Sequence, residues 1–363
     1  MKRVRWTTAA LAGAVVVATA AVTAATPGSS GARELTPRQL AGQRVIYSYP
    51  GLTPPDTLLQ RIRAGEAGGV IFFGENISST SQLAGVVKQL RAAAAQSPVH
   101  EPLLLMTDQE GGKVRRLPGE PTLSEKQVGQ GADPEAAAKA AGAGAGNNLA
   151  GVGLNVNLAP VLDVYRQEGN FIDQYGRSYS NDPAKVTTLG RDAIAAQQAT
   201  GVAATGKHFP GLGAAPAGSN TDVAPVTLPM SAAELRATDE APYAQTAAKL
   251  VMLSWAIYPA LDAKNPAGLS PAVVQQELRQ RDGFRGVTIT DALEAGALRD
   301  FGDTGNRAVL AAKAGDDLIL ASARDVGQGD AAADALAAAY GKGELPGFTA
   351  SLDRISALRK GLR

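Results

Sequence analysis

Residues 202–208 read VAATGKH and residues 286–291 read GVTITD. In both stretches a short run of small and apolar residues leads directly into charged residues, which are Lys207 and His208 in the first and Asp291 in the second. A run that is apolar on both faces is typical of a parallel strand covered by helices. Because parallel strands bring their carboxyl ends together, charged residues at these ends predict a shared functional face.

Similar runs recur along the chain and alternate with helical patterns. The expected strands are 44–47, 69–73, 103–106, 155–158, 202–205, 250–253, 287–289 and 317–320. The helical patterns between them include 81–95, 134–150, 183–199, 232–248, 271–281 and 306–314. This alternation predicts an α/β fold, a (β/α)8 TIM-type barrel in a single catalytic domain. A doubly wound open sheet is the competing fold, but no GxGxxG loop follows the first strand.

The composition excludes several classes of protein. Of the 363 residues, 45% are hydrophobic and 19% charged, which is too apolar for a disordered chain. Lys and Arg number 35 against 34 Asp and Glu, so we expect no nucleic-acid partner. Cys is absent and His100 and His208 are the only histidines, which excludes disulfides and a cysteine nucleophile and argues against a histidine-rich metal site.

The N-terminus has the pattern of a secretory signal peptide. A basic segment at 2–5 precedes the apolar run 9–21, and this run is shorter than the ~20 residues that a membrane-spanning helix needs. No cysteine follows for lipid attachment, so we expect a secreted, extracellular protein with no membrane partner after cleavage. The expected boundaries are a signal peptide at 1–25, a linker at 26–34 and a catalytic domain at 35–363.

Two motifs at predicted strand ends carry groups suited to chemistry. The segment 106–117 reads MTDQEGGKVRRL, in which two glycines permit a tight turn beside Asp108 and Glu110. These carboxylates suit acid–base chemistry, or Asp108 binds ligand hydroxyls. The segment 206–213 reads GKHFPGLG and opens an irregular loop that runs to about Pro225. Loops of this length are usually functional lids or disordered.

Alternatives remain for the charged residues at the last two strand ends. An extended chain would point Lys207 and His208 to opposite sides, and His208 could simply bond to the backbone at the strand end. Asp291 follows the strand 287–289, where a carboxylate can be a nucleophile, a metal ligand or the cap of a following helix.

Five motifs occur in a fixed order: DQEGGKVRRL at 108–117, NLAPVLDV at 157–164, GRSYSNDP at 176–183, GKHFPGLG at 206–213 and ITDALEAGA at 289–297. Together they resemble the N-terminal catalytic domain of glycoside hydrolase family 3, and most closely its single-barrel bacterial β-N-acetylhexosaminidase branch. The resemblance runs from about Thr36 to Arg363. It implies one barrel without the sandwich-like second domain of many plant and fungal relatives.

The resemblance implies a retaining exo-glycosidase that needs no metal ion or organic cofactor, with Asp291 as the nucleophile. The family's sugar-binding positions fall on Asp108, Arg116, Arg177, Lys207 and His208. Such side chains supply the donors and acceptors that vicinal hydroxyls need. The implied reaction is removal of a terminal β-linked N-acetylhexosamine, most simply N-acetylglucosamine, by a secreted monomer. The implied partners are peptidoglycan fragments or chitooligosaccharides.

The sequence departs from the branch at the acid/base group. The branch carries KHFPGHG and then D-S-H, whose histidine is the general acid/base. This chain has Leu212 in place of the first of those histidines and Asn220-Thr221-Asp222 where D-S-H would fall. Asp222 is therefore the predicted acid/base on a closing lid, and Glu110 is the next candidate. Two alternatives remain, an exo-β-glucosidase or other β-glycosidase of the family, and a non-catalytic sugar-binding relative.

Overall fold

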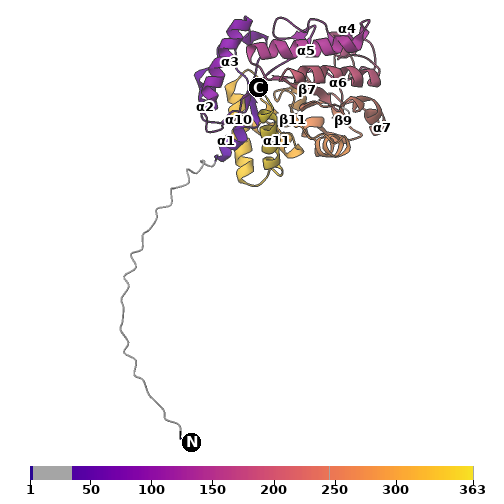
Figure 1. Cartoon of the computed structure of the whole chain (residues 1–363). Coiled ribbons are helices and arrows are strands. Elements are labelled where there is room, and N and C mark those ends of the chain that lie inside the picture. Colours follow the sequence, from indigo (N-terminus) through magenta and orange to yellow (C-terminus); the bar gives the residue numbers. More distant parts are fainter. Residues whose placement is uncertain (3–34, 245, 363) are drawn as a thin grey trace. The chain divides into compact units, whose positions relative to one another are not determined.

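The computed structural model describes residues 1–2, 35–244 and 246–362, shown as ribbons in Figure 1. The expected signal peptide and linker fall mainly on residues 3–34, outside this part. Within the described ranges no helix is both long and apolar enough to cross a membrane.

Eight parallel strands form one sheet in the order β11-β8-β7-β6-β3-β2-β1-β12. The strands are β1 (Val45–Tyr47), β2 (Gly69–Ile71), β3 (Leu104–Thr107), β6 (Val156–Asn157), β7 (Ala203–Phe209), β8 (Leu250–Leu253), β11 (Val287–Ile289) and β12 (Ile319–Leu320). A parallel bridge between Ile289 and Leu318 joins the two end strands, so the sheet closes on itself. The predicted (β/α)8 barrel is confirmed.

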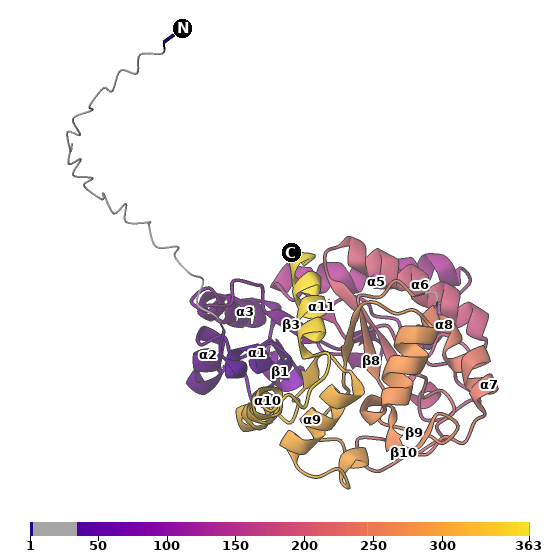
Figure 2. The same cartoon turned by 90° about the horizontal axis from the view of Figure 1, so that it is seen from below.

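Helices surround the strands, as Figure 2 shows. The α-helices are α1 (Pro37–Gly42), α2 (Asp56–Arg63), α3 (Thr80–Ala94), α4 (Glu125–Gln130), α5 (Pro134–Val152), α6 (Pro183–Ala199), α7 (Ala232–Glu234), α8 (Ala241–Ala244), α9 (Thr304–Ala314), α10 (Val326–Gly341) and α11 (Phe348–Lys360). Shorter or wider helical turns are η1 (Gly74–Asn76), η2 (Asp173–Tyr175), η3 (Leu235–Asp239), η4 (Ala267–Leu269), η5 (Ala272–Arg281) and η6 (Gly296–Leu298). Two small hairpins pair β4 (Gln109–Gly111) with β5 (Val114–Arg115), and β9 (Ile257–Tyr258) with β10 (Asp262–Pro266).

Local sequence explains where several helices begin and end. Asp133 and Asp182 each accept a backbone hydrogen bond in the first turn of α5 and α6, and a proline follows each. The continuous helix expected at 232–248 is wrong: the segment divides into α7, the π-type turn η3 and α8. Pro242 lies at the start of the last piece, where it has no N–H to continue a helix from the preceding turn.

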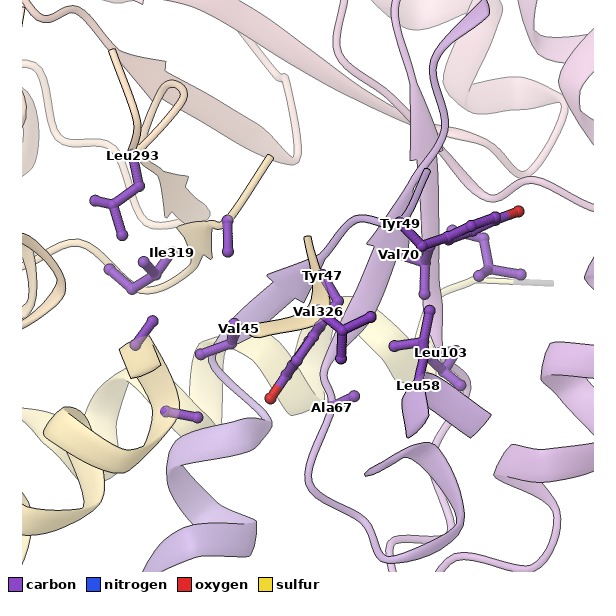
Figure 3. Packing of buried hydrophobic residues seen from close by; sticks show 14 of the residues in the cluster. Val45, Tyr47, Tyr49, Leu58, Ala67, Val70, Leu103, Leu293, Ile319 and Val326 are labelled. Atoms are coloured by element: carbon purple, nitrogen blue, oxygen red, sulfur yellow. The ribbon is translucent and has the colours of Figure 1, made fainter. Parts of the chain in front are cut away.

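The core has an inner and an outer layer. Each strand points at least one residue into the barrel. The inner cluster, with its extension at the strand ends, consists of Ile46, Ile71, Leu104, Met106, Val156, Leu158, Ala203, Leu250, Met252, Val287, Ile289, Leu318 and Leu320. The alternate residues point outward toward the helices. Figure 3 shows Val45 and Tyr47 of β1, Val70 of β2 and Leu58 of α2 among the buried residues of this outer layer.

The two ends of the barrel differ. Ile355 and Leu358 of α11 join the inner cluster, and Arg359 donates to the carbonyl of Gly68, just before β2. Helix α11 therefore covers the amino-terminal ends of the strands. The opposite end, where the strands finish, is left to the loops that carry the charged motifs.

Candidate active site

A pocket of about 410 Å³ opens at the carboxyl ends of the strands. The residues predicted for the site all line it: Asp108, Arg116, Arg177, Lys207, His208, Asp222 and Asp291. They come from the loops after β3, β6, β7 and β11, and from the end of β7 itself. Segments far apart in sequence thus meet at one end of the barrel, where enzymes of this fold keep their active sites.

Lys207 is buried between two carboxylates. Its Nζ lies 2.7 Å from Asp108 Oδ1 and 2.6 Å from Glu110 Oε1, and the residue is 2% exposed. Burial by itself lowers the pKa of Lys207, but the charges of Asp108 and Glu110 outweigh burial and raise it. Lys207 therefore remains a cation at the pocket wall. Arg116 adds a second cation, with its Nε 4.0 Å from Asp108 Oδ2.

Glu110 organises the cations and is not an acid. Arg177 donates two hydrogen bonds to its carboxylate, at 2.8 and 2.9 Å, and Lys207 approaches from the other side. Burial favours the neutral form, but Arg177 and Lys207 outweigh it and lower the pKa of Glu110 to about 2. A group ionised so strongly has no proton to give. The ion pairs of Glu110 with Arg177 and Lys207 argue against Glu110 as the next acid/base candidate, and its role in holding these two cations is one the motif did not reveal.

His208 is oriented by a carboxylate from the neighbouring strand's loop. Its Nδ1 lies 2.8 Å from Asp163 Oδ2, and the other oxygen of Asp163 accepts the backbone N–H of Leu212 at 2.7 Å. With the proton on Nδ1, the other ring nitrogen, Nε2, faces Arg177 and lies 3.4 Å from its Nη2. The alternative of a simple backbone bond for His208 is wrong, because its ring binds Asp163.

Lys207 and His208 both line the pocket, so the expectation that they point to opposite sides is also wrong.

Asp291 stands at the end of β11 without capping a helix. Its Oδ1 accepts the backbone N–H of Ala292 at 2.7 Å, and the next helical turn begins only at Gly296. The helix-cap alternative is therefore wrong. Burial raises the pKa of Asp291, His208 opposes the rise, and the negative charge of Asp222 adds to it. Asp291 and Asp222 line the same pocket.

The loop that carries Asp222 is docked on the loop that carries Asp291. Gly296 N–H donates to the carbonyl of Asp222 at 2.8 Å, and Ala297 N–H donates to that of Thr221 at 2.9 Å. The side chain of Asn220, not that of Asp222, closes the turn by accepting the backbone N–H of Asp222 at 2.9 Å. The Asp222 carboxylate accepts no hydrogen bond from any other described residue, is exposed and faces the pocket.

Comparison with known proteins identifies the family of this chain. The profile of the glycosyl hydrolase family 3 N-terminal domain matches residues 39–358. The chain belongs to glycosyl hydrolase family 3. This family 3 chain is 49% identical over 330 residues to an uncharacterized secreted glycosyl hydrolase of Arthroderma benhamiae, covering 89% of this chain and 93% of the other. It is 34% identical to a beta-hexosaminidase of Idiomarina loihiensis, covering 74% and 80% of the two chains.

A solved structure of a family 3 enzyme agrees with the fold. A β-N-acetylglucosaminidase from Paenibacillus sp. superposes with a TM-score of 0.84 at 35% identity, over 90% of this chain. The family 3 chain described here spans 63% of that longer chain. The protein is therefore an O-glycosyl hydrolase similar to β-N-acetylhexosaminidases, and its substrate is a carbohydrate.

Proposed function

We propose that this family 3 enzyme is an exo-acting, retaining β-N-acetylglucosaminidase with a covalent glycosyl-enzyme on Asp291. One observation carries the proposal: Asp291 and Asp222 share a pocket with the buried cluster of Lys207, Arg177 and Glu110. A retaining glycosidase needs two carboxyl groups at the scissile bond, and a fixed set of donors and acceptors around the sugar.

The reaction takes two steps. In the first, Asp291 attacks the anomeric carbon, the bond to the glycosidic oxygen breaks, and the proton of Asp222 passes to the departing oxygen. In the second, the ionised Asp222 removes a proton from water, whose oxygen attacks the anomeric carbon and releases Asp291. The docked loop supports this role for Asp222 because it holds the acid beside the nucleophile instead of leaving it on a free lid.

The proposed glycone site consists of five side chains that line the pocket: Asp108, Arg116, Arg177, Lys207 and His208. Glu110 and Asp163 hold three of them in place from behind, since they bind Lys207, Arg177 and His208. Such side chains bind sugar hydroxyls by charge-assisted hydrogen bonds, which are about twice as strong as neutral ones.

A panel of aryl β-glycosides tests the proposed substrate. We expect the purified protein to release the aryl group from the N-acetylglucosaminide, with β-configured N-acetylglucosamine as the first product by NMR. Preferential hydrolysis of the β-glucoside would favour an exo-β-glucosidase instead. Failure to hydrolyse any aryl glycoside, with N-acetylglucosamine still bound in calorimetry, would favour a non-catalytic sugar-binding protein.

Replacing Lys207 by Met tests the glycone site, because Met keeps most of the alkyl stem and removes the charge. Loss of one buried charge-assisted contact costs ~1.5–3 kcal/mol, so inhibition by N-acetylglucosamine is expected to weaken roughly ten- to hundredfold. Lys88→Met, on the exposed face of α3, is the matched control. An unchanged inhibition constant for Lys207→Met would assign this lysine to the fold alone.

Replacing Gly296 by Ala tests the docking of the Asp222 loop. A Cβ at Gly296 would lie 2.2 Å from the carbonyl oxygen of Val223 and 3.0 Å from that of Asp222, so the loop must shift. We expect hydrolysis of a disaccharide to fall at least about tenfold, a ~1.4 kcal/mol effect, with a smaller loss on an activated aryl glycoside. Gly85→Ala in α3, where a Cβ meets nothing within 4 Å, is the control. Equal losses on both substrates would contradict a specific effect on the acid.

The proposed setting is outside the cell, where peptidoglycan fragments or chitooligosaccharides would supply terminal N-acetylglucosamine. The basic segment and apolar run at 2–21 support export, as does the secreted relative of Arthroderma benhamiae. We propose cleavage of residues 1–25, a linker at 26–34 and a monomeric catalytic domain at 35–363. N-terminal sequencing of protein from the culture medium would locate the cleavage site.

A further inference from the structure

Arg324 has an unusual backbone conformation. Among the described residues it is the only non-glycine with a positive φ, at 59°. Left-handed backbone is unfavourable for residues other than glycine and is retained mainly where the surroundings enforce it, often at ligand sites. Here the backbone N–H of Arg324 donates to Ser48 Oγ at 2.8 Å, and Ser48 in turn donates to the carbonyl of Ala321. The loop after β12 is thereby fixed to the end of β1.

The side chain of Arg324 forms a layered structure with two residues that follow β2. Its guanidinium lies over the ring of Phe73, 4.1 Å from the centroid, and its Nε is 3.3 Å from Glu75 Oε1. Phe73 is itself held, because its N–H donates to the side chain of Asn76 and Asn76 donates to the carbonyl of Tyr49. The guanidinium plane is therefore oriented by an aromatic ring below it and a carboxylate at its edge.

Arg324 and Phe73 line the same pocket as the glycone site. The glycone residues lie in β7 or in the loops after β3 and β6. Phe73 follows β2, next to β3, whereas Arg324 follows β12, across the ring of strands from β6. Asp291 follows β11, next to β12 in the ring of strands. A sugar held by the β3–β7 side, with its anomeric carbon at Asp291, would direct its leaving group away from that side and toward Arg324.

The chemistry of Arg324 fits a neutral sugar better than an anion. Glu75 already balances its charge, so an incoming carboxylate would have to compete with an existing ion pair. The face of the guanidinium opposite Phe73 is flat, and Arg stacks well on ring faces while its N–H groups donate to hydroxyls at the edge. The side chain is 44% exposed, as a group that meets an incoming ring must be.

We propose that Arg324, supported by Phe73, is the aglycone subsite, a platform for the second, uncharged pyranose ring of the substrate. The proposal rests on the proposed glycosidase function and adds to it the residue that selects the leaving group. Its left-handed backbone is then a cost in stability that the fold retains for binding.

Two variants and two substrates test the platform. Arg324→Ala and Arg324→Gly both remove the guanidinium, and both are expected to lower kcat/KM for N,N′-diacetylchitobiose about tenfold. The same variants should leave kcat/KM for N-acetylglucosaminyl fluoride within twofold, because fluoride offers no ring to bind. Arg324→Gly should also keep or raise the melting temperature, since glycine adopts a positive φ freely. Arg191→Ala, on the exposed face of α6, is the control.

The outcomes separate the subsite from the function on which it rests. Unchanged chitobiose kinetics in both variants would overturn the platform, and so would equal losses on the fluoride and the disaccharide, which would place Arg324 at the glycone. A wild-type enzyme that hydrolyses neither substrate would overturn the proposed function, and the subsite with it. A disaccharide analogue with a charged group at O6 should show the same tenfold loss of kcat/KM as chitobiose. Equal losses would support the platform further, because they would show that Arg324 does not recognise the charge of the second ring.

Discussion

Asp291→Ala is expected to lower kcat for every substrate by about 10³-fold or more, on the order of 4 kcal/mol of transition-state stabilisation. No other group described in the pocket stands at the end of β11 to form the glycosyl-enzyme. The fold should survive, because Asp291 contributes only a local hydrogen bond to Ala292 at the mouth of the barrel. Asp300→Ala, an exposed carboxylate further along the same loop, should retain full activity.

The pH dependence gives an independent test of this nucleophile. Asp291 must be ionised to attack, and its pKa is raised above the ordinary 3.8, first by burial and also by Asp222. The acid limb of kcat/KM should therefore lie above pH 3.8. N-acetylglucosaminyl fluoride is the substrate for this profile, since fluoride leaves without an acid.

The stability of the Asp291→Asn variant supplies a control for the pH profile. A carboxyl whose pKa is raised in the folded state keeps a proton that the unfolded chain loses, so its contribution to stability is present below the unfolded pKa and is lost as pH rises through the folded pKa. Asp291→Asn cannot lose that contribution. At neutral pH it should therefore be at least as stable as the wild type in denaturant titrations while being inactive. A 5-fluoro glycosyl fluoride should label Asp291 in the wild type, and labelling of another carboxylate would contradict the assignment.

Much of the barrel could be predicted because its strands are short, apolar and buried on both faces. The expected strands 250–253 and 287–289 coincide with β8 and β11, and the expected helix 183–199 coincides with α6. The Gly-rich stretch within α5 lets this helix pack closely on α6, since a Cβ on Gly142 would lie 2.1 Å from the carbonyl oxygen of Ala193. Periodicity failed at 232–248, where Pro242 and the wide turn η3 break the helix.

The candidate site, like the fold, could be predicted only in part. Asp108, Lys207 and Asp291 could be found because each lies at the end of an apolar strand. Arg116, Arg177 and Asp222 were predicted only from the family resemblance. The partners that hold these side chains come from other strands and leave no local signal. The ionised state of Glu110 depends on Arg177, 67 positions away, and on Lys207. The orientation of His208 depends on Asp163. Arg324 had no signal at all, because neither its left-handed backbone nor its contact with Phe73 can be read from the sequence around it.

Asp222→Ala is expected to slow hydrolysis by an amount that depends on the leaving group. Its loss of activity on a poor leaving group should be the largest after that of Asp291→Ala. A sugar alkoxide leaves poorly without a proton, so kcat/KM for N,N′-diacetylchitobiose should fall about 10²–10⁴-fold, the usual contribution of general acid catalysis. An aryl N-acetylglucosaminide with an activated phenol should form the glycosyl-enzyme at close to the wild-type rate. The same alanine removes the base for the second step, so this intermediate should accumulate.

Added azide distinguishes a catalytic role of Asp222 from a purely structural role in shaping the pocket. As an anion that needs no base, azide should attack the accumulated glycosyl-enzyme in Asp222→Ala and restore aryl glycoside turnover with a β-glycosyl azide as product. Asp291→Ala forms no such intermediate, so azide could react there only by direct attack from the face that Asp291 occupied, which would give the α-glycosyl azide instead. The docked loop makes this test sharp, because the carbonyls of Thr221 and Asp222 that bind Ala297 and Gly296 remain in the alanine variant. Hydrolysis of the disaccharide at the parental rate would show that another group gives the proton, and Glu294, which lines the same pocket and accepts a hydrogen bond from Ser322, would then be the carboxylate to replace.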